Sequence, residues 1–144
     1  MNNESISAIY FKNIENFFSV IVSLGIVRAS FDPNTVSYND LQEVQSKFIV
    51  FSKRIIMNLE KSFKMEMATF SFNEEIGWIK NNLELVTPDK NYQPLWEDAK
   101  QKIDKISDFI DFLRDDLLKN QLTQEEFKKV KKAVNLAGYQ IDSL

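Results

Sequence analysis

Apolar residues recur every three to four positions along most of this chain, and this spacing constrains the fold more than any other feature. Between Leu95 and Leu117, the apolar side chains follow one another in steps of four and three residues. That period places them on one face of an α-helix, whereas a half-buried strand needs strict alternation. Only three glycines and three prolines interrupt the 144 residues, so the helices have few points at which to end. The sequence therefore predicts an all-α protein.

Breaks in the pattern divide the chain into about five helices. The clearest breaks are the turn residues Asp32-Pro33-Asn34 and the stretch from Val86 to Pro94. The predicted helices run from about Ser5 to Arg28, Ser37 to Met67, Phe72 to Leu85, Pro94 to Asn120, and Thr123 to Gly138. A chain of this length suits one domain, so we expect residues 1–144 to fold as a single helical bundle.

The first predicted helix is apolar around most of its circumference. Four of its apolar side chains lie beside the main apolar face: Phe11, Phe18, Val22 and Ile26. Such a helix is either buried among several neighbours or lies at a subunit interface. We expect the segment 17–27, with Val50 and Met57, to belong to the core; the alternative is a homodimer interface.

The residue types that are missing exclude several classes of site. The chain contains no cysteine and no histidine. It therefore has no thiol nucleophile, no disulfide, no imidazole acid or base, and none of the usual zinc or haem ligands. Its three glycines are isolated, so no glycine-rich phosphate loop is present. We expect no enzyme, no cofactor, no metal and no catalytic residue.

No segment predicts a membrane span or a secretion signal. The longest apolar run, Phe17 to Val27, is shorter than the roughly 20 residues that cross a bilayer, and no basic region precedes it. The lack of cysteine fits a reducing compartment. We therefore expect a soluble, cytoplasmic protein with no membrane partner. The many Asn, Lys, Ile and Phe residues suggest an AT-rich bacterial or phage gene.

The charged residues are distributed unevenly. The net charge is −3, which argues against a nucleic-acid partner, because phosphate contacts need a basic face. Residues 71–120 carry seven basic and eleven acidic side chains, whereas residues 121–144 carry four basic and three acidic ones. The acidity therefore belongs to one part of the chain.

Four aspartates lie about one turn apart on the fourth predicted helix, and we call them the aspartate row: Asp104, Asp108, Asp111 and Asp115. Their spacing places them within roughly 60° of arc, well away from the apolar face. Like charges on neighbouring turns repel, so folding alone does not favour this arrangement. Phe112 is expected to be an exposed aromatic beside the row. Aromatic side chains anchor interfaces and clustered charge steers a partner, so the pattern favours protein binding.

The aspartate row also has a plainer interpretation as a solvated surface. If the last predicted helix lies antiparallel to the fourth, its lysines offset the aspartates. These lysines are Lys128, Lys129, Lys131 and Lys132. The sequence leaves both interpretations open.

We expect a non-catalytic protein that binds a basic protein partner through a surface composed of Asp104, Asp108, Asp111, Phe112 and Asp115. In its most concrete form it is an inhibitor of the immunity or antitoxin type, which masks a nuclease-like bacterial toxin. The basis for this form is an analogy of architecture and charge, and no motif carries it.

Two alternatives remain. The first is a magnesium-dependent all-α nucleotide hydrolase, whose metal ligands would be Glu74, Glu75, Asp108 and Asp111. Trp78 stands where such a site needs a third glutamate, so the match is partial. The second alternative is a structural or scaffold subunit.

Overall fold

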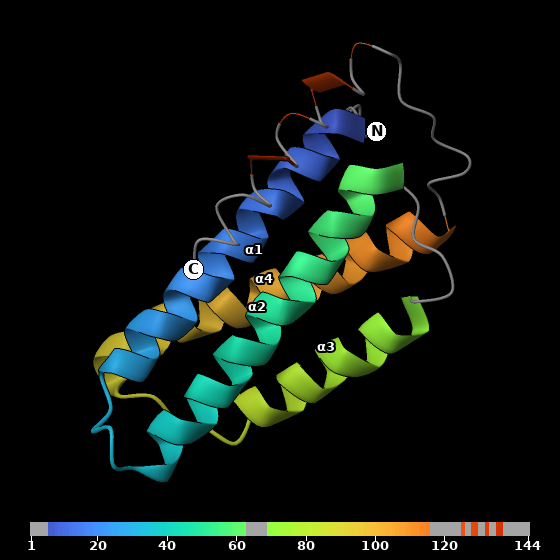
Figure 1. Ribbon diagram of the computed structural model, residues 1–144. Helices are drawn as coiled ribbons and strands as arrows, with labels where there is room; N and C mark the ends of the chain where they lie inside the picture. The colour runs from blue at the N-terminus through green and yellow to red at the C-terminus, as the bar shows by residue number, and fades with distance from the viewer. Residues whose placement is uncertain are drawn as a thin grey trace.

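Helices account for nearly all of the structure that this computed structural model describes. The described residues are 6–62, 69–115, 125, 128, 129, 132, 135 and 136. The elements are α1 (Ile6–Ala29), α2 (Val36–Ser62), α3 (Thr69–Leu83), the short 3-10 helix η1 (Lys90–Tyr92) and α4 (Gln93–Asp115), as Figure 1 shows. No strand occurs in these ranges, which confirms the all-α prediction.

The described residues form four α-helices, where the sequence predicts about five. Helices α1 to α4 correspond to the first four predicted helices, with ends that differ by a few residues. The fifth predicted helix, from Thr123 to Gly138, lies largely outside the described residues, as do positions 63–67 and 116–120. The six residues described beyond α4 have helical backbone.

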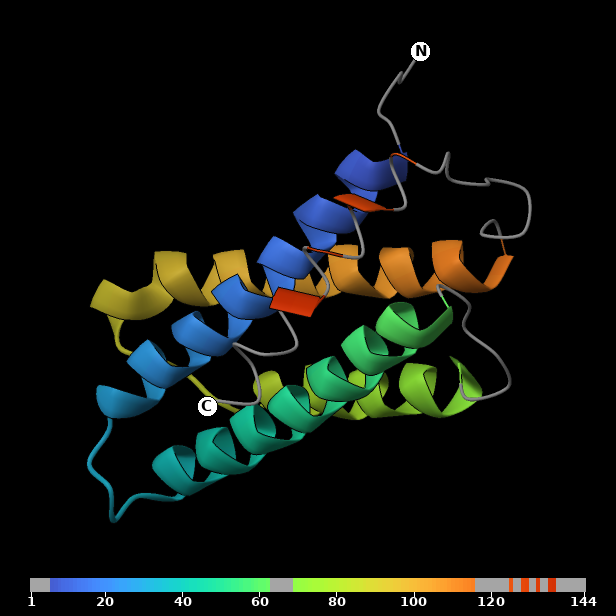
Figure 2. The ribbon, with the colours of Figure 1, turned by 45° about the horizontal axis from the view of Figure 1, so that its top comes forward.

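The four helices contact one another in a closed ring. Helix α1 packs against α2 and α4, and α3 packs against the same two helices from the other side. Figure 1 shows α1 beside α2, with α4 crossing behind them; in both Figures 1 and 2, α3 lies next to α2. Each helix therefore turns one side toward a shared interior.

The turn between α1 and α2 is held by side chains of its own residues. The carboxylate of Asp32 accepts a hydrogen bond from the backbone N–H of Asn34 at 2.9 Å. The hydroxyl of Thr35 accepts one from the backbone N–H of Tyr38 at 3.3 Å, which caps α2. Helix α2 therefore begins at Val36, one residue before the predicted start at Ser37, because Thr35 serves as its cap.

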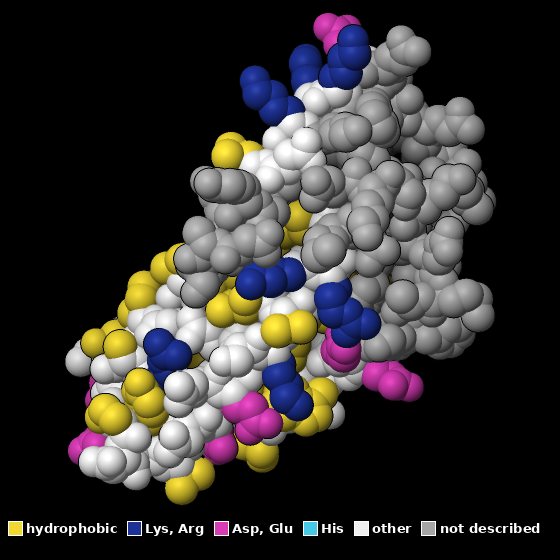
Figure 3. Space-filling model, viewed as in Figure 1, with side chains coloured by type: hydrophobic (Ala, Val, Ile, Leu, Met, Phe, Trp, Pro, Cys, Tyr) yellow, Lys and Arg dark blue, Asp and Glu magenta, His cyan; other side chains and the backbone are white. Residues whose placement is uncertain are grey.

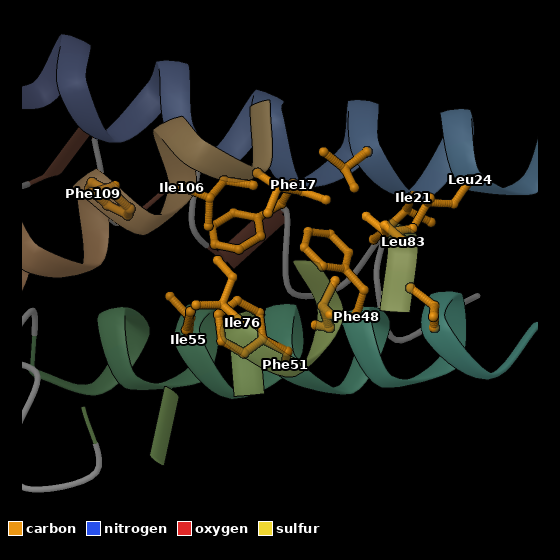
Figure 4. Packing of buried hydrophobic residues seen from close by; sticks show 14 of the residues in the cluster. Phe17, Ile21, Leu24, Phe48, Phe51, Ile55, Ile76, Leu83, Ile106 and Phe109 are labelled. Atoms are coloured by element: carbon orange, nitrogen blue, oxygen red, sulfur yellow. The ribbon is translucent and has the colours of Figure 1, made fainter. Parts of the chain in front are cut away.

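Aromatic rings form the centre of the interior. The rings of Phe17, Phe48 and Phe51 lie 6.0–6.5 Å apart between centroids. Each of the four helices contributes to the surrounding cluster, and Figure 4 shows Phe17, Ile21, Leu24, Phe48, Phe51, Ile55, Ile76, Leu83, Ile106 and Phe109. Burial of this apolar surface is the main contribution to the stability of the bundle.

One close approach joins α1 to α2. The side-chain amide of Gln45 donates a hydrogen bond to the backbone oxygen of Ile21 at 3.0 Å. A Cβ atom at position 25 would lie only 3.0 Å from that amide nitrogen, so Gly25 leaves the space that the contact needs. A glycine inside a helix is about 1 kcal/mol less favourable than alanine, so Gly25 lowers the intrinsic stability of α1 by about that amount.

The expectation that segment 17–27 and Val50 belong to the core is partly wrong. Phe17 and Leu24 are fully buried, but Val22 is 58% exposed, Ile26 44% and Val50 55%. Helix α1 packs against α2 and α4, and these contacts do not bury the side chains of Val22 and Ile26. The side chain of Met57 lies outside the described residues.

A membrane crossing requires a helix that is both long and apolar enough, and the described part of the chain contains none.

Replacing Phe48 by alanine is expected to lower the free energy of unfolding by about 3–5 kcal/mol, because the ring is fully buried among other aromatic rings. Urea denaturation followed by circular dichroism measures the change. Val36→Ala is the control: Val36 is 76% exposed, and its loss should alter stability by less than about 0.5 kcal/mol. Equal losses in the two variants would contradict the assigned core.

Candidate functional site

Helix α4 turns its polar side outward because its apolar side is fixed in the core. Its buried residues are Trp96, Ala99, Ile103, Ile106, Phe109 and Ile110. Asp104 and Asp108 consequently lie at the surface, whereas Asp111 is half-buried. Asp115 is the last described residue of α4, and its side chain lies outside the described residues. The structure therefore places the first two members of the aspartate row where the spacing predicts them.

Asp104 forms an ion pair that the sequence analysis did not identify. The ammonium group of Lys80, on α3, lies 3.0 Å from its carboxylate. The side chains of Lys80 and Asp104 are 38% and 69% exposed, and ion pairs this accessible contribute at most about 1 kcal/mol. Lys80 of α3 thus balances the negative charge of Asp104, whose side chain stays accessible to solvent.

Phe112 is half-buried, so the expectation of an exposed aromatic is wrong. Its ring stacks on that of Phe109 at a centroid distance of 6.3 Å. It also meets the ring of Tyr10 edge to face at 6.5 Å. Helix α1 packs along α4, and its Tyr10 covers part of a ring that the sequence pattern places on the polar side of the helix, beside the aspartate row.

A groove of about 460 Å³ lies between α1 and α4, and it brings Asp108 and Phe112 to one place. We call it the α1–α4 groove. Its apolar lining consists of Ile9, Phe109 and Phe112. Its polar lining consists of Lys12, Asn13, Asn16, Lys105 and Asp108.

Two nearly buried asparagines of α1 contribute to the polar lining of this groove. Asn13 and Asn16 are only 8% and 9% exposed, respectively. The amide nitrogen of Asn13 donates to the backbone oxygen of Ile9 at 2.8 Å, but its buried side-chain oxygen has no hydrogen-bond partner in the described structure. Buried polar atoms usually have a partner. The sequence carries a signal for this site, since both asparagines interrupt the apolar face of the first predicted helix.

The charges around the groove are mixed. Lys12 and Lys105 are exposed and line the groove together with Asp108. Carboxamides supply both hydrogen-bond donors and acceptors, ammonium groups donate, and a carboxylate accepts. This set of groups is suited to binding a polypeptide surface through ion pairs and hydrogen bonds.

The alternative metal site receives no support from the described residues. The guanidinium of Arg54, on α2, donates a hydrogen bond to the carboxylate of Glu75 on α3. Glu74 is exposed beside it, and Asp108 and Asp111 belong to α4. Within the described ranges, no group of three or more acidic, histidine or cysteine side chains is arranged to hold a metal ion.

Comparisons of this chain with protein families, with curated proteins and with solved structures found no match.

Tyr10, beside the α1–α4 groove, is expected to make stability fall at alkaline pH. Burial raises the pKa of Tyr10 well above its ordinary value of 10.0. Below pH 10 the tyrosine is neutral in the folded and the unfolded chain. Above it, only the unfolded chain ionises, so the free energy of unfolding drops by up to about 1.4 kcal/mol per pH unit.

Urea denaturation of the wild type and of Tyr10→Phe between pH 9 and pH 11 measures this effect. The phenylalanine variant keeps the ring and lacks the ionisable hydroxyl, so it should lose less stability over this range. The same decline in both proteins would show that Tyr10 is not the group responsible.

Proposed function

We propose that this chain is a non-catalytic helical bundle that binds a basic protein partner through the aspartate row and the α1–α4 groove. The observation that carries this proposal is the setting of Asp108. Its carboxylate is exposed and lines the groove, and no ion pair joins it to another described residue. A cationic side chain of a partner would therefore find an accessible carboxylate that none of the described lysines or arginines pairs with.

Three neighbours of Asp108 on α4 support the same assignment. Asp104 and Asp111 lie one turn before and after Asp108, and they add negative potential along α4. Such clustered charge raises the rate at which an oppositely charged protein associates. The half-buried ring of Phe112 offers apolar area beside the carboxylates, as aromatic side chains do at the centre of many interfaces.

Lys12 and Lys105 would restrict which basic proteins can bind. They stand beside Asp108 at the same groove, so a uniformly basic surface would meet repulsion there. A partner that is basic overall, with acidic groups placed opposite these lysines, would fit this surface better than an unrelated basic protein.

In its most concrete form, the partner is a nucleic-acid-directed bacterial toxin. Proteins that bind nucleic acid need a basic face for phosphate contacts, and a carboxylate-bearing inhibitor can cover that face. The chain would then act in the cytoplasm as an immunity protein or antitoxin. This form of the proposal rests on charge and architecture alone.

Self-association through α1 is a second candidate for the interaction partner. Val22 and Ile26 are 58% and 44% exposed, and they lie one turn apart on α1, where the contacts with α2 and α4 leave both side chains accessible. Sedimentation equilibrium distinguishes a homodimer from a monomer. A dimer that persists when Val22 and Ile26 are both replaced by glutamate would exclude this face as its interface.

The double variant Asp108→Asn, Asp111→Asn is expected to weaken binding of the partner by about tenfold at low salt, and to reduce the salt dependence of the association rate. The partner is captured on the immobilised chain from a lysate of the source organism, identified, purified, and measured by surface plasmon resonance.

The matched control is Glu43→Gln, Glu74→Gln, which removes the same charge from exposed positions on α2 and α3. It should leave the affinity unchanged within about twofold. If the aspartate variant binds as tightly as the wild type, the aspartate row is not the binding surface. If both variants lose the same affinity, only net charge matters and the assigned face is wrong.

A further inference from the structure

A second groove lies between α2 and α3, at the edge of the helix ring opposite the α1–α4 groove. We call it the α2–α3 groove, and its volume is about 300 Å³. Figure 3 shows hydrophobic, basic and acidic side chains side by side on the face formed by α2 and α3. Its apolar lining consists of Val50, Phe51, Trp78 and Ile79, and its charged lining of Lys47 and Glu75.

The size of this groove suits a small molecule of about two rings. A cavity of about 150 Å³ accommodates one benzene molecule, and small-molecule sites begin at about 300 Å³. Phe51 and Ile79 are each 1% exposed and form an apolar floor. Trp78 is half-buried beside them, while Val50 is 55% exposed at the rim. When an aromatic ring of a ligand binds here, apolar surface of the ligand and of the protein is removed from water.

The charge at the groove favours an anionic group on that molecule. Among the described residues that line the groove, Lys47 is the cation and Glu75 is the anion, and Glu75 is paired with Arg54 of α2. The ammonium group of Lys47 lies 4.1 Å from the centroid of the Trp78 ring and 3.8 Å from the carboxylate of Glu43. The side chains of Lys47 and Glu43 are 54% and 58% exposed, so that ion pair is weak and a ligand carboxylate can compete for the ammonium group.

We propose that the α2–α3 groove binds a small aromatic carboxylate. The ring lies between Val50 and Trp78, above the floor formed by Phe51 and Ile79, and the carboxylate pairs with Lys47. This site shares no residue with the aspartate row or the α1–α4 groove, so it stands independently of the proposed protein partner.

The chain contains its own reporter for this binding. It has two tryptophans, and Trp96 is only 2% exposed in the core. Trp78 lines the groove, so a ligand that enters should change the emission of Trp78 and leave that of Trp96 nearly constant. The probe is biphenyl-4-carboxylate, an anion with two rings. Its positively charged analogue 4-(aminomethyl)biphenyl and its neutral analogue biphenyl-4-methanol test the contribution of charge.

Titration of the full chain with biphenyl-4-carboxylate should give a saturable change in tryptophan emission. The cationic analogue should bind at least fivefold more weakly than the carboxylate. In Lys47→Met, the carboxylate and the neutral analogue should bind equally within about twofold, because the ammonium group that distinguishes them is gone.

Val50→Glu should weaken binding of the carboxylate by at least tenfold, since it places a negative charge at the rim. Leu85→Glu is the matched control: Leu85 is an exposed apolar residue outside the groove, 76% accessible, and its replacement should leave binding unchanged. Circular dichroism and thermal unfolding establish that each variant folds. If Val50→Glu does not fold, Val50→Trp, which narrows the groove without adding charge, takes its place.

Three results would overturn the proposal. The first is the absence of a saturable change at millimolar biphenyl-4-carboxylate. The second is a cationic analogue that binds as tightly as the carboxylate, since the groove would then not select an anion. The third is wild-type affinity in the folded Val50 variant, which would place the bound molecule elsewhere.

Discussion

The aromatic and aliphatic cluster at the centre of the helix ring is the constraint on which the rest of the structure depends. No helix of this chain can bury its apolar face alone, and α1 to α4 meet around the rings of Phe17, Phe48 and Phe51. This shared interior fixes the rotation of each helix about its own axis. The polar sides then face solvent, and the surface between neighbouring helices takes the form of grooves.

The two grooves differ because different helix pairs form them. The α1–α4 groove combines two nearly buried asparagines with Asp108 and two lysines, which suits the varied polar groups of a protein surface. The described lining of the α2–α3 groove is mostly apolar; its cation, Lys47, is only loosely paired, and its anion, Glu75, is paired with Arg54, which suits a ligand with an aromatic ring and a negative charge. Because they lie at opposite edges of the ring, a molecule in one would leave the other accessible.

The sequence predicts correctly those features that depend on one helix at a time. The outward positions of Asp104 and Asp108 follow from the apolar period of α4, because that period decides which side enters the core. The burial of Phe112 and the exposure of Val22 depend instead on which neighbour lies against the flank of a helix. A helical wheel gives the direction of a side chain about its own axis. It does not give the element that the side chain meets.

The sequence by itself determined the all-α class, the approximate bounds of α1 to α4, the outward direction of the exposed aspartates, and the lack of any cysteine or histidine chemistry. These follow from local periodicity and residue type. Only the tertiary structure decided that Lys80 pairs with Asp104, that Arg54 pairs with Glu75, and that Asn13 and Asp108 share a groove. Each of these depends on the distance between residues far apart in the chain, and that distance is set by the order in which the helices surround their common core.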